Sequence, residues 1–426
     1  MAIFYELDET SGLSAKIKVI GVGGGGGNAI NNMIRQNMTG VEFIVANTDA
    51  QAIEKSQAEV RLQLGSEQTR GLGAGAKPQI GKEAAELEKD HLRELLVDTD
   101  MLFITAGMGG GTGTGAAPVI AEVAKEMGIL SVGIVTKPFT FEGRRRMKQA
   151  EEGIQELHKF IDTLIVIPNQ KLLGSVSKNT SLMDSFLEAD NVLYQAVKGI
   201  SDLIANSGYI NVDFADVKSV MSEEQSMAMM GTGRATGENR ACEAIEKAIS
   251  SSLLEDVNIQ GARAVLINVT GNETVGLHEV DEAASIISNM VDEDANIIFG
   301  LVTDPDMGDE LSITVVATGL NHKISPVTPK KPVQEAVEGL EAATQTEVTI
   351  PRAKNYARFE ATKTVNSALK SNEPASYDEK KLNIPALDRQ NLEARAVGGS
   401  RGLAAREVAH DKDQISIPAW IRKQAD

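Results

Sequence analysis

GMGGGTGTGAAP, residues 107–118, is the stretch that decides the fold. It follows the apolar run MLFITA (101–106), which is typical of a buried strand, and leads into a helical pattern over residues 116–127. Glycines at a strand-to-helix turn let backbone N–H groups come close to a phosphate, and the start of the helix adds a favourable dipole. The stretch therefore predicts a phosphate-binding turn in an α/β sheet.

The first half of the chain repeats this alternation of strand and helix. Short apolar, β-branched runs predict further strands at 16–21, 42–47, 130–136 and 163–167, and a helix is expected at 79–98. This order is typical of a doubly wound, Rossmann-like sheet.

A long helix is expected next, from about 181 to 207. Its apolar positions form one stripe at helical spacing: Val192, Leu193, Ala196, Val197, Ile200, Leu203 and Ile204. A second, smaller α/β domain follows over about 208–320, with strands at 262–269, 296–302 and 311–317 and helices near 238–250 and 277–290. The long helix is expected to lie between the two domains.

A second glycine-rich turn, GVGGGGGN (21–28), ends the first predicted strand. It fits the pattern GxGxxG, and Asp49 lies at the spacing of a ribose-binding carboxylate, so a Rossmann-type dinucleotide-dependent oxidoreductase is an alternative. No Lys-Ser/Thr pair follows the glycines, which excludes a P-loop. Two glycine turns at neighbouring strand ends favour a triphosphate held from both sides, and GLGAGA (71–76) is expected to close over its terminal phosphate.

The glycine stretch also carries a family resemblance. GGGTGTG (109–115) is similar to the signature of the tubulin/FtsZ GTPase family, and NVDFAD (211–216) resembles that family's catalytic loop. The resemblance extends from about residue 16 to 320, and the terminal IPAWIRKQAD resembles the family's C-terminal peptide. It implies GTP and GDP binding, GTP hydrolysis and head-to-tail polymerisation into the bacterial division ring.

The resemblance and the composition together divide the chain into six segments. These are an N-terminal extension (1–14), a GTP-binding domain (15–180), the central helix (181–207), a C-terminal GTPase-activating domain (208–321), a linker (322–411) and a partner-binding peptide (412–426). The linker holds six of the 12 prolines and shows little periodicity, so it is expected to be disordered.

The resemblance assigns nucleotide contacts residue by residue. Phosphates are expected at Gly24, Gly25, Gly26, Gly27, Ala74, Gly75, Gly111, Thr112 and Gly113. The sugar or base is expected at Asn28, the ribose and phosphate at Glu142 and Arg146, and a further nucleotide contact at Asn169. Glu142 and Arg146 are expected in a loop after the strand at 130–136.

Base recognition is assigned to the long helix. Phe186 and Asp190 lie four residues apart, hence on one face. An aromatic ring can stack on a purine, and a carboxylate accepts from guanine N1–H and the exocyclic amine but repels adenine N1. The neighbouring pair Asp190-Asn191 leaves two candidates for the side chain that reads the base.

The catalytic proposal rests on Asp213 and Asp216, with Asn211 in the same loop. Two carboxylates three residues apart at a helix start can orient a water and accept its proton, although Asp213 alone also fits a helix N-cap. The resemblance implies that this loop completes the pocket of the next subunit. Mg²⁺ is expected to be bound mainly through phosphates and water.

Composition limits the remaining possibilities. The 426 residues carry 42 Lys and Arg against 60 Asp and Glu, a net charge of −18, which argues against direct nucleic-acid binding. One cysteine, Cys242, excludes an internal disulfide, and five histidines make a zinc cluster unexpected. No secretory signal or membrane-spanning run is visible, so a soluble protein of a reducing compartment is expected.

The resemblance places this protein in the cytoplasm, at the midcell division site beneath the inner membrane. Its expected partners are further copies of itself and, through residues 413–426, membrane-tethering adaptors and division regulators. That segment combines Trp420, several isoleucines and two basic residues, so direct membrane contact is the alternative reading.

Overall fold

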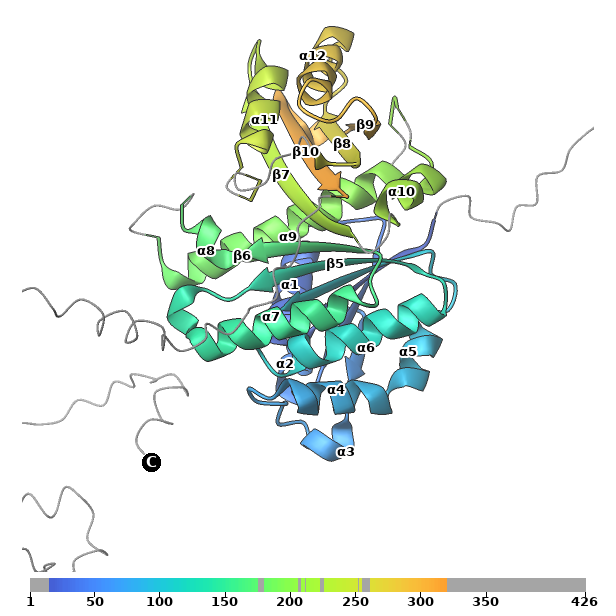
Figure 1. Cartoon of the computed structure of the whole chain (residues 1–426), viewed down its shortest axis with the longest axis vertical. Helices are drawn as coiled ribbons and strands as arrows, with labels where there is room; N and C mark the ends of the chain where they lie inside the picture. Colours follow the sequence, from blue (N-terminus) through green and yellow to red (C-terminus); the bar gives the residue numbers. More distant parts are fainter. Residues whose placement is uncertain are drawn as a thin grey trace, which may run out of the picture. The chain divides into compact units, whose positions relative to one another are not determined.

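The computed structural model describes residues 15–174, 180–205, 208–210, 212–222, 226–251, 253–254 and 261–319 (Figure 1). All of them belong to the first of two units, Met1–Pro329 and Lys330–Asp426. The expected N-terminal extension, linker and C-terminal peptide lie outside the described residues, as does Asn211.

One sheet runs through the described residues in the order β3-β2-β1-β4-β5-β6-β7-β10-β8-β9. Its strands are β1 (Ile17–Val22), β2 (Glu42–Asn47), β3 (Val60–Gln63), β4 (Met101–Gly107), β5 (Leu130–Lys137), β6 (Thr163–Pro168), β7 (Ser226–Thr236), β8 (Ala264–Gly271), β9 (Asn296–Thr303) and β10 (Glu310–Thr318). β1 to β6 are parallel, and Val22 of β1 lies opposite Ala106 of β4. Their carboxyl ends therefore meet at one edge, where ligands bind in doubly wound sheets.

The C-terminal half extends the same sheet. The first residues of β7 pair in parallel with β6, and β7 then pairs antiparallel with β10. β10 is antiparallel to β8, which is parallel to β9. The predicted second α/β domain is thus present, and β7 joins its strands to the first domain.

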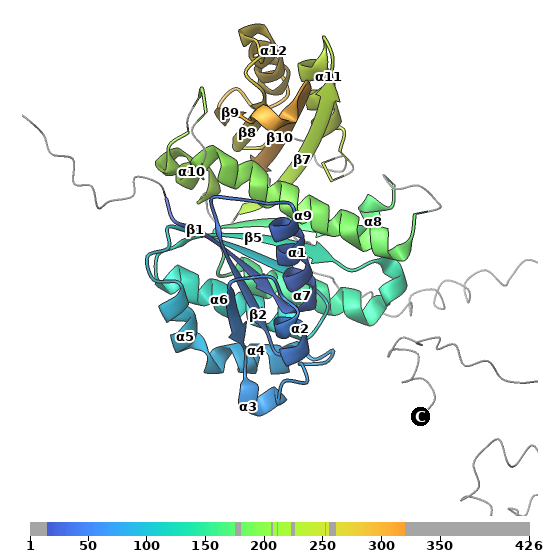
Figure 2. The ribbon, with the colours of Figure 1, turned by 180° about the vertical axis from the view of Figure 1, so that it is seen from behind.

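Helices cover both faces of the sheet (Figures 1 and 2). α1 (Gly23–Arg35), α9 (Leu182–Ala205) and α10 (Phe214–Met221) contribute to one buried cluster. α4 (Pro78–Leu87), α5 (Lys89–Leu95), α6 (Thr112–Glu126) and α7 (Arg144–His158) cover the opposite face. α11 (Arg240–Ile249) and α12 (Leu277–Ser288) pack on the C-terminal strands. The short helices are α2 (Ala50–Glu54), α3 (Ser66–Thr69), α8 (Asn169–Leu172), η1 (Thr140–Glu142) and η3 (Pro305–Met307).

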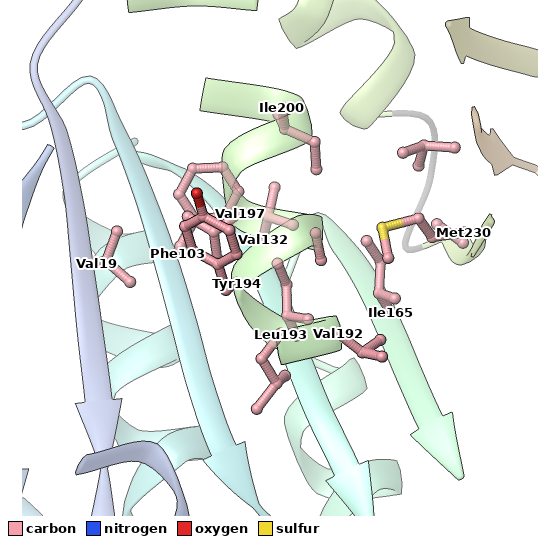
Figure 3. Packing of buried hydrophobic residues seen from close by; sticks show 14 of the residues in the cluster. Val19, Phe103, Val132, Ile165, Val192, Leu193, Tyr194, Val197, Ile200 and Met230 are labelled. Carbon is pink, nitrogen blue, oxygen red and sulfur yellow. The ribbon is translucent and has the colours of Figure 1, made fainter. Parts of the chain in front are cut away.

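The long helix α9 packs its predicted stripe into the core. Figure 3 shows Val192, Leu193, Val197 and Ile200 against strand residues such as Phe103. Ala196 and Leu203 are buried as well, and Ile204 is partly buried against the same cluster. Each fully buried aliphatic side chain contributes roughly 1.5–3 kcal/mol, so the stripe fixes α9 on the sheet.

Three local expectations are corrected. The helix expected at 79–98 is two helices, because α4 ends at Leu87 and α5 begins at Lys89. The loop expected to carry Arg146 is the start of α7. The glycines after β1 form the first turn of α1 rather than a loop, because β1 ends at Val22 and α1 begins at the next residue, Gly23.

Candidate nucleotide site

The two glycine-rich helix starts lie side by side at the carboxyl edge of the sheet. A Cβ added to Gly23 of α1 would lie 2.8 Å from the backbone N of Gly113 in α6. The first N–H groups of a helix have no partner within the helix, so two such sets converge here. Neither first turn contains an acidic residue. The donor set of N–H groups and hydroxyls suits the oxygens of a phosphate chain.

The predicted phosphate glycines differ in exposure. Gly24 and Gly25 are exposed, and a Cβ on Gly24 would meet nothing within 4 Å. Gly26 is buried, and a Cβ there would lie 2.4 Å from the carbonyl oxygen of Thr105. Gly24 and Gly25 therefore face the site, whereas Gly26 permits α1 to pack against β4. Gly27 is partly exposed and Asn28 exposed, one helical step further along α1.

The glycine loop at 71–76 lies against the glycine stretch at 107–118. A Cβ on Gly111 would lie 2.2 Å from the carbonyl oxygen of Gly75 and 2.9 Å from Cβ of Ala74. The hydroxyls of Thr112 and Thr48 are 2.7 Å apart. These contacts bring Ala74, Gly75, Gly111 and Thr112 together at the start of α6. Gly113 beside them approaches the carbonyl oxygen of Gly107 too closely for any side chain.

Asp49 has a different task from the one in the oxidoreductase alternative. Its Oδ1 accepts from the backbone N of Gln51 at 2.9 Å and of Ala52 at 3.3 Å. These bonds make Asp49 the N-cap of α2, which accounts for its position after β2 without a ribose.

An aromatic cluster marks the other end of the site. Phe139 is buried and its ring meets that of Phe186 edge-on at 5.4 Å between centroids. It also stacks with Phe141 at 5.3 Å. Phe186 remains 38% exposed, so part of this residue is accessible to a ligand.

Asp190 lies one turn after Phe186 on α9. Burial raises the pKa of its carboxyl to about 7, and the positive charge of Arg35 on α1 acts in the opposite direction. Its neighbour Asn191 is engaged elsewhere: its Oδ1 accepts from Asn32 Nδ2 and Gln36 Nε2, both at 3.0 Å. The two candidates for the base reader therefore have different surroundings.

Three further predicted contacts lie after β5 and β6. Glu142 Oε1 accepts from the backbone N of Phe139 at 2.8 Å, and its Oε2 pairs with Arg146 at 2.7 Å. Arg146 is half exposed on α7. Asn169 begins α8, is buried, and its Oδ1 has no hydrogen-bond partner. A buried acceptor of this kind requires a donor from a bound molecule or water.

The predicted catalytic carboxylates, Asp213 and Asp216, lie at the start of α10, apart from the predicted nucleotide contacts at the carboxyl edge of the sheet. Asp213 occupies the N-cap position of α10 but makes no side-chain cap bond, and Asp216 lies in the first turn. Both are exposed, and neither has a side-chain partner among the described residues. The backbone N of Asp216 donates to the carbonyl oxygen of Asp213 at 3.0 Å, which places the two residues on one turn.

α9 separates α10 from the glycine turns. It begins near Phe139, beyond the carboxyl end of β5, and its last residue Ala205 meets Gly40, which precedes the amino end of β2. Its 24 residues span about 36 Å at 1.5 Å per residue. At the far end of α10, the carbonyl oxygen of Met221 accepts from the hydroxyl of Thr163, the first residue of β6. The carboxylates thus lie toward the amino edge of the sheet.

The described residues hold neither a metal-binding cluster nor a membrane-spanning helix. They contain no group of three or more His, Cys, Asp or Glu side chains placed to hold a metal ion. None of their helices is long and apolar enough to cross a membrane.

Fold and site together define an α/β protein of the nucleotide-binding class, in which two glycine-rich helix starts meet at the carboxyl edge of the sheet. Residues 16–177 match the tubulin/FtsZ family, GTPase domain, and residues 226–321 match the FtsZ family, C-terminal domain. The chain therefore belongs to the FtsZ family of tubulin-like GTPases, and it is a GTP-hydrolysing, polymerising cell-division protein of the cytoskeleton.

Individual relatives support the same family assignment. The cell division protein FtsZ of Pseudomonas aeruginosa is 49% identical over 99% of this chain and 100% of its own length. That of Coxiella burnetii is 57% identical over 78% of this chain and 86% of its own. A solved FtsZ dimer of M. jannaschii is 45% identical, with a TM-score of 0.69 over 72% of this chain and 88% of that one. The sequence-based assignment to the tubulin/FtsZ GTPase family is confirmed, and the oxidoreductase alternative is not supported.

Proposed function

We propose that GTP lies along the carboxyl edge of β1, β4 and β5, with its phosphates between the starts of α1 and α6. Gly24, Gly25 and Gly111 present backbone N–H groups there, and Thr112 adds a hydroxyl. The single observation that carries this proposal is the close packing of the two helix starts, where a Cβ added to Gly23 would lie 2.8 Å from the backbone N of Gly113. Ala74 and Gly75, packed on Gly111, contact the γ-phosphate.

The base lies toward α9 in this proposal. Phe186 offers its partly exposed side chain, Asn169 supplies an unpaired buried acceptor, and Asp190 accepts from guanine N1–H and the exocyclic amine. Glu142 and Arg146 contact the ribose and phosphate. Asp190 is the preferred reader over Asn191, because the Oδ1 of Asn191 already accepts two hydrogen bonds from α1.

Hydrolysis is completed by the next subunit. The carboxylates of Asp213 and Asp216 lie toward the amino edge and follow the far end of α9, which extends about 22 Å beyond Asp190. Head-to-tail stacking brings the amino edge of one subunit onto the carboxyl edge of another. Asp216 then orients the attacking water and accepts its proton, while Asp213 holds the water from the other side. Asn211 belongs to the same loop in this proposal.

Both edges carry exposed apolar side chains that suit such stacking. Leu72, in the third glycine loop, is 83% exposed, and Met183, at the start of α9, is 72% exposed. Tyr209, just before α10, is 73% exposed. Burying these side chains between subunits contributes favourable free energy to assembly.

Mg²⁺ fits this site as an ion held mainly by phosphate oxygens and water. The helix starts offer N–H and hydroxyl donors and no first-turn carboxylate, so the oxygens for the cation come with the nucleotide. When bound, the ion neutralises charge that develops on the phosphates.

The Asp216→Ala variant tests the shared site. It is expected to bind GTP and polymerise normally while hydrolysing GTP roughly 10²–10⁴-fold more slowly, the usual contribution of a general base. Asp281→Ala, an exposed aspartate on α12, is the matched control and should hydrolyse GTP at the wild-type rate. Near-normal phosphate release from Asp216→Ala polymers would exclude the assigned role.

Residues 413–426, outside the described residues, are proposed to bind membrane-tethering adaptors and division regulators. This places the protein at the midcell division site, in the cytoplasm, with only indirect membrane contact. A chain lacking 413–426 should retain GTP hydrolysis and polymer formation and lose adaptor binding. Adaptor binding that persists in this deletion would refute the assignment.

A further inference from the structure

A hydrogen-bonded amide cluster joins α1 to α9 close to the base side of the site. Oδ1 of Asn191 on α9 accepts from Nδ2 of Asn32 on α1 and from Nε2 of Gln36, which caps the end of α1. Both distances are 3.0 Å, and the partners are 159 and 155 residues apart in the sequence. Bonds between side chains are a minority of protein hydrogen bonds, and two donors that converge on one oxygen fix its position.

The donors are held in place by the fold. Asn32 is 7% exposed, so its amide cannot turn to bulk water without loss. α1 itself is anchored by Ala29, Ile30 and Met33 in the core that α9 also enters. Figure 2 shows the two helices next to each other on the same face of the sheet. The amide cluster therefore fixes the position of α9 relative to α1, which is itself anchored in the core.

The cluster directly follows proposed nucleotide contacts on both helices. On α1, Asn28 lies one turn before Asn32 and on the same face, near the phosphate-binding start of the helix. On α9, Asp190 directly precedes Asn191, and Phe186 lies one turn earlier. Adjacent helical residues are about 100° apart around the axis, so fixing Asn191 also fixes the direction in which Asp190 points.

We infer that Asn191 is a positioning residue for base selection: held by Asn32 and Gln36, it fixes the rotation of α9 and thereby aims Asp190 and Phe186 at guanine. The inference rests on the proposed role of Asp190. Recognition through paired hydrogen bonds tolerates only about 0.5 Å of displacement, so a residue that never touches the nucleotide can still govern the preference for GTP. It also couples the helix that holds phosphate to the helix that reads the base.

The test is nucleotide selectivity, which a purely structural contact would not alter. Dissociation constants for GTP and ATP are measured with the full chain, below the concentration at which it assembles. Asn191→Ala should lower the preference for GTP over ATP roughly three- to tenfold, the range expected from one lost hydrogen bond, and leave ATP binding unchanged. Gln195→Ala is the matched control. Gln195 also lies on α9 and makes a side-chain hydrogen bond, but its Oε1 accepts from the hydroxyl of Thr232 on β7 instead of from α1. This control variant should keep the wild-type preference.

Two further variants decide how Asn191 acts. Asn32→Ala should lower the preference in the same way, and the Asn32→Ala/Asn191→Ala double variant should lose no more than either single variant. If Asn191 contacted the base directly, Asn32→Ala would be silent, and the inference would be wrong. Gln36→Ala changes an exposed residue and removes one of the two donors, so it should lower the preference for GTP by a smaller factor. This variant replaces Asn191→Ala in the test if Asn191→Ala does not fold.

Asp190→Ala separates failure of the inference from failure of the proposed function. If Asp190→Ala loses the preference for GTP and Asn191→Ala keeps it, the positioning role alone is refuted. If Asp190→Ala keeps the preference while Asn191→Ala loses it, Asn191 is itself the base reader and both statements fall. A preference retained in both variants also refutes both.

Discussion

The buried carboxyl of Asp190 makes a sharp prediction about pH. Burial raises its pKa from 3.8 to about 7, against the opposing charge of Arg35. Guanine recognition requires the ionised form, because only a carboxylate accepts both donors of the base. About nine-tenths of the carboxyls are ionised at pH 8 and about one-tenth at pH 6. The affinity for GTP should therefore fall about tenfold between pH 8 and pH 6.

Equilibrium binding of GTP and ATP across this pH range measures the effect. Protonation of Asp190 removes its repulsion of adenine N1, so ATP affinity should not fall with that of GTP, and the ratio of the two constants isolates the base. Arg35→Gln removes the cation that favours ionisation, and it should shift the midpoint to higher pH. A GTP-to-ATP ratio that stays constant from pH 8 to pH 6 would refute the assignment.

The same shift has a consequence for stability. The folded state holds the proton up to about pH 7, whereas the unfolded chain releases it near 3.8, so stability falls as pH rises between these values. A shift of about three units corresponds to at most about 4 kcal/mol. Asp190→Asn, which cannot ionise, should therefore raise the free energy of unfolding at pH 8 and leave it nearly unchanged at pH 4, as chemical denaturation of the nucleotide-free protein would show.

Two other changes have clear expected outcomes. Gly111→Ala places a Cβ 2.2 Å from the carbonyl oxygen of Gly75, so it should separate the two phosphate loops and weaken GTP binding at least tenfold by titration, whereas Gly261→Ala, in open space, should not. Arg240 is 4% exposed, and Arg240→Met removes its guanidinium from Glu279 (2.7 Å) and from the exposed Asp309 (3.2 Å). Because solvent screens both carboxylates, urea denaturation should show a loss of roughly 1–2 kcal/mol. Equal stabilities of Arg240→Met and the wild type would contradict this account of the cluster.

Much of the fold is readable from local sequence because its strands are buried on both faces. Runs such as MLFITA have no charged residue, glycine or proline to confuse with a loop, and β4 is found where that run predicts it. β3, with the sequence VRLQ, is a half-exposed edge strand whose charged residue hides the pattern. α7 begins with three arginines that resemble a solvated loop, and its buried residues appear only further along the helix.

The glycines of the candidate site could be predicted from the sequence, whereas the roles of several of its side chains could not. The steric need for glycine at Gly111 or Gly113 follows from backbone approach, which the motif reports directly. Asp49 and Asn191 are different, because their tasks depend on partners that only the fold supplies: the start of α2 for one and the side chains of α1 for the other. Spacing alone cannot distinguish a helix cap or an inter-helix bond from a ligand contact.

The central claim is that the pocket for hydrolysis is completed by a neighbouring subunit. The most direct measurement is the rate of phosphate release at saturating GTP as a function of protein concentration. The account predicts almost no release below the concentration at which light scattering reports assembly and a linear rise above it, with Asp216→Ala assembling at a similar concentration but releasing little phosphate. A line through the origin, with constant turnover per chain at every concentration, would contradict it.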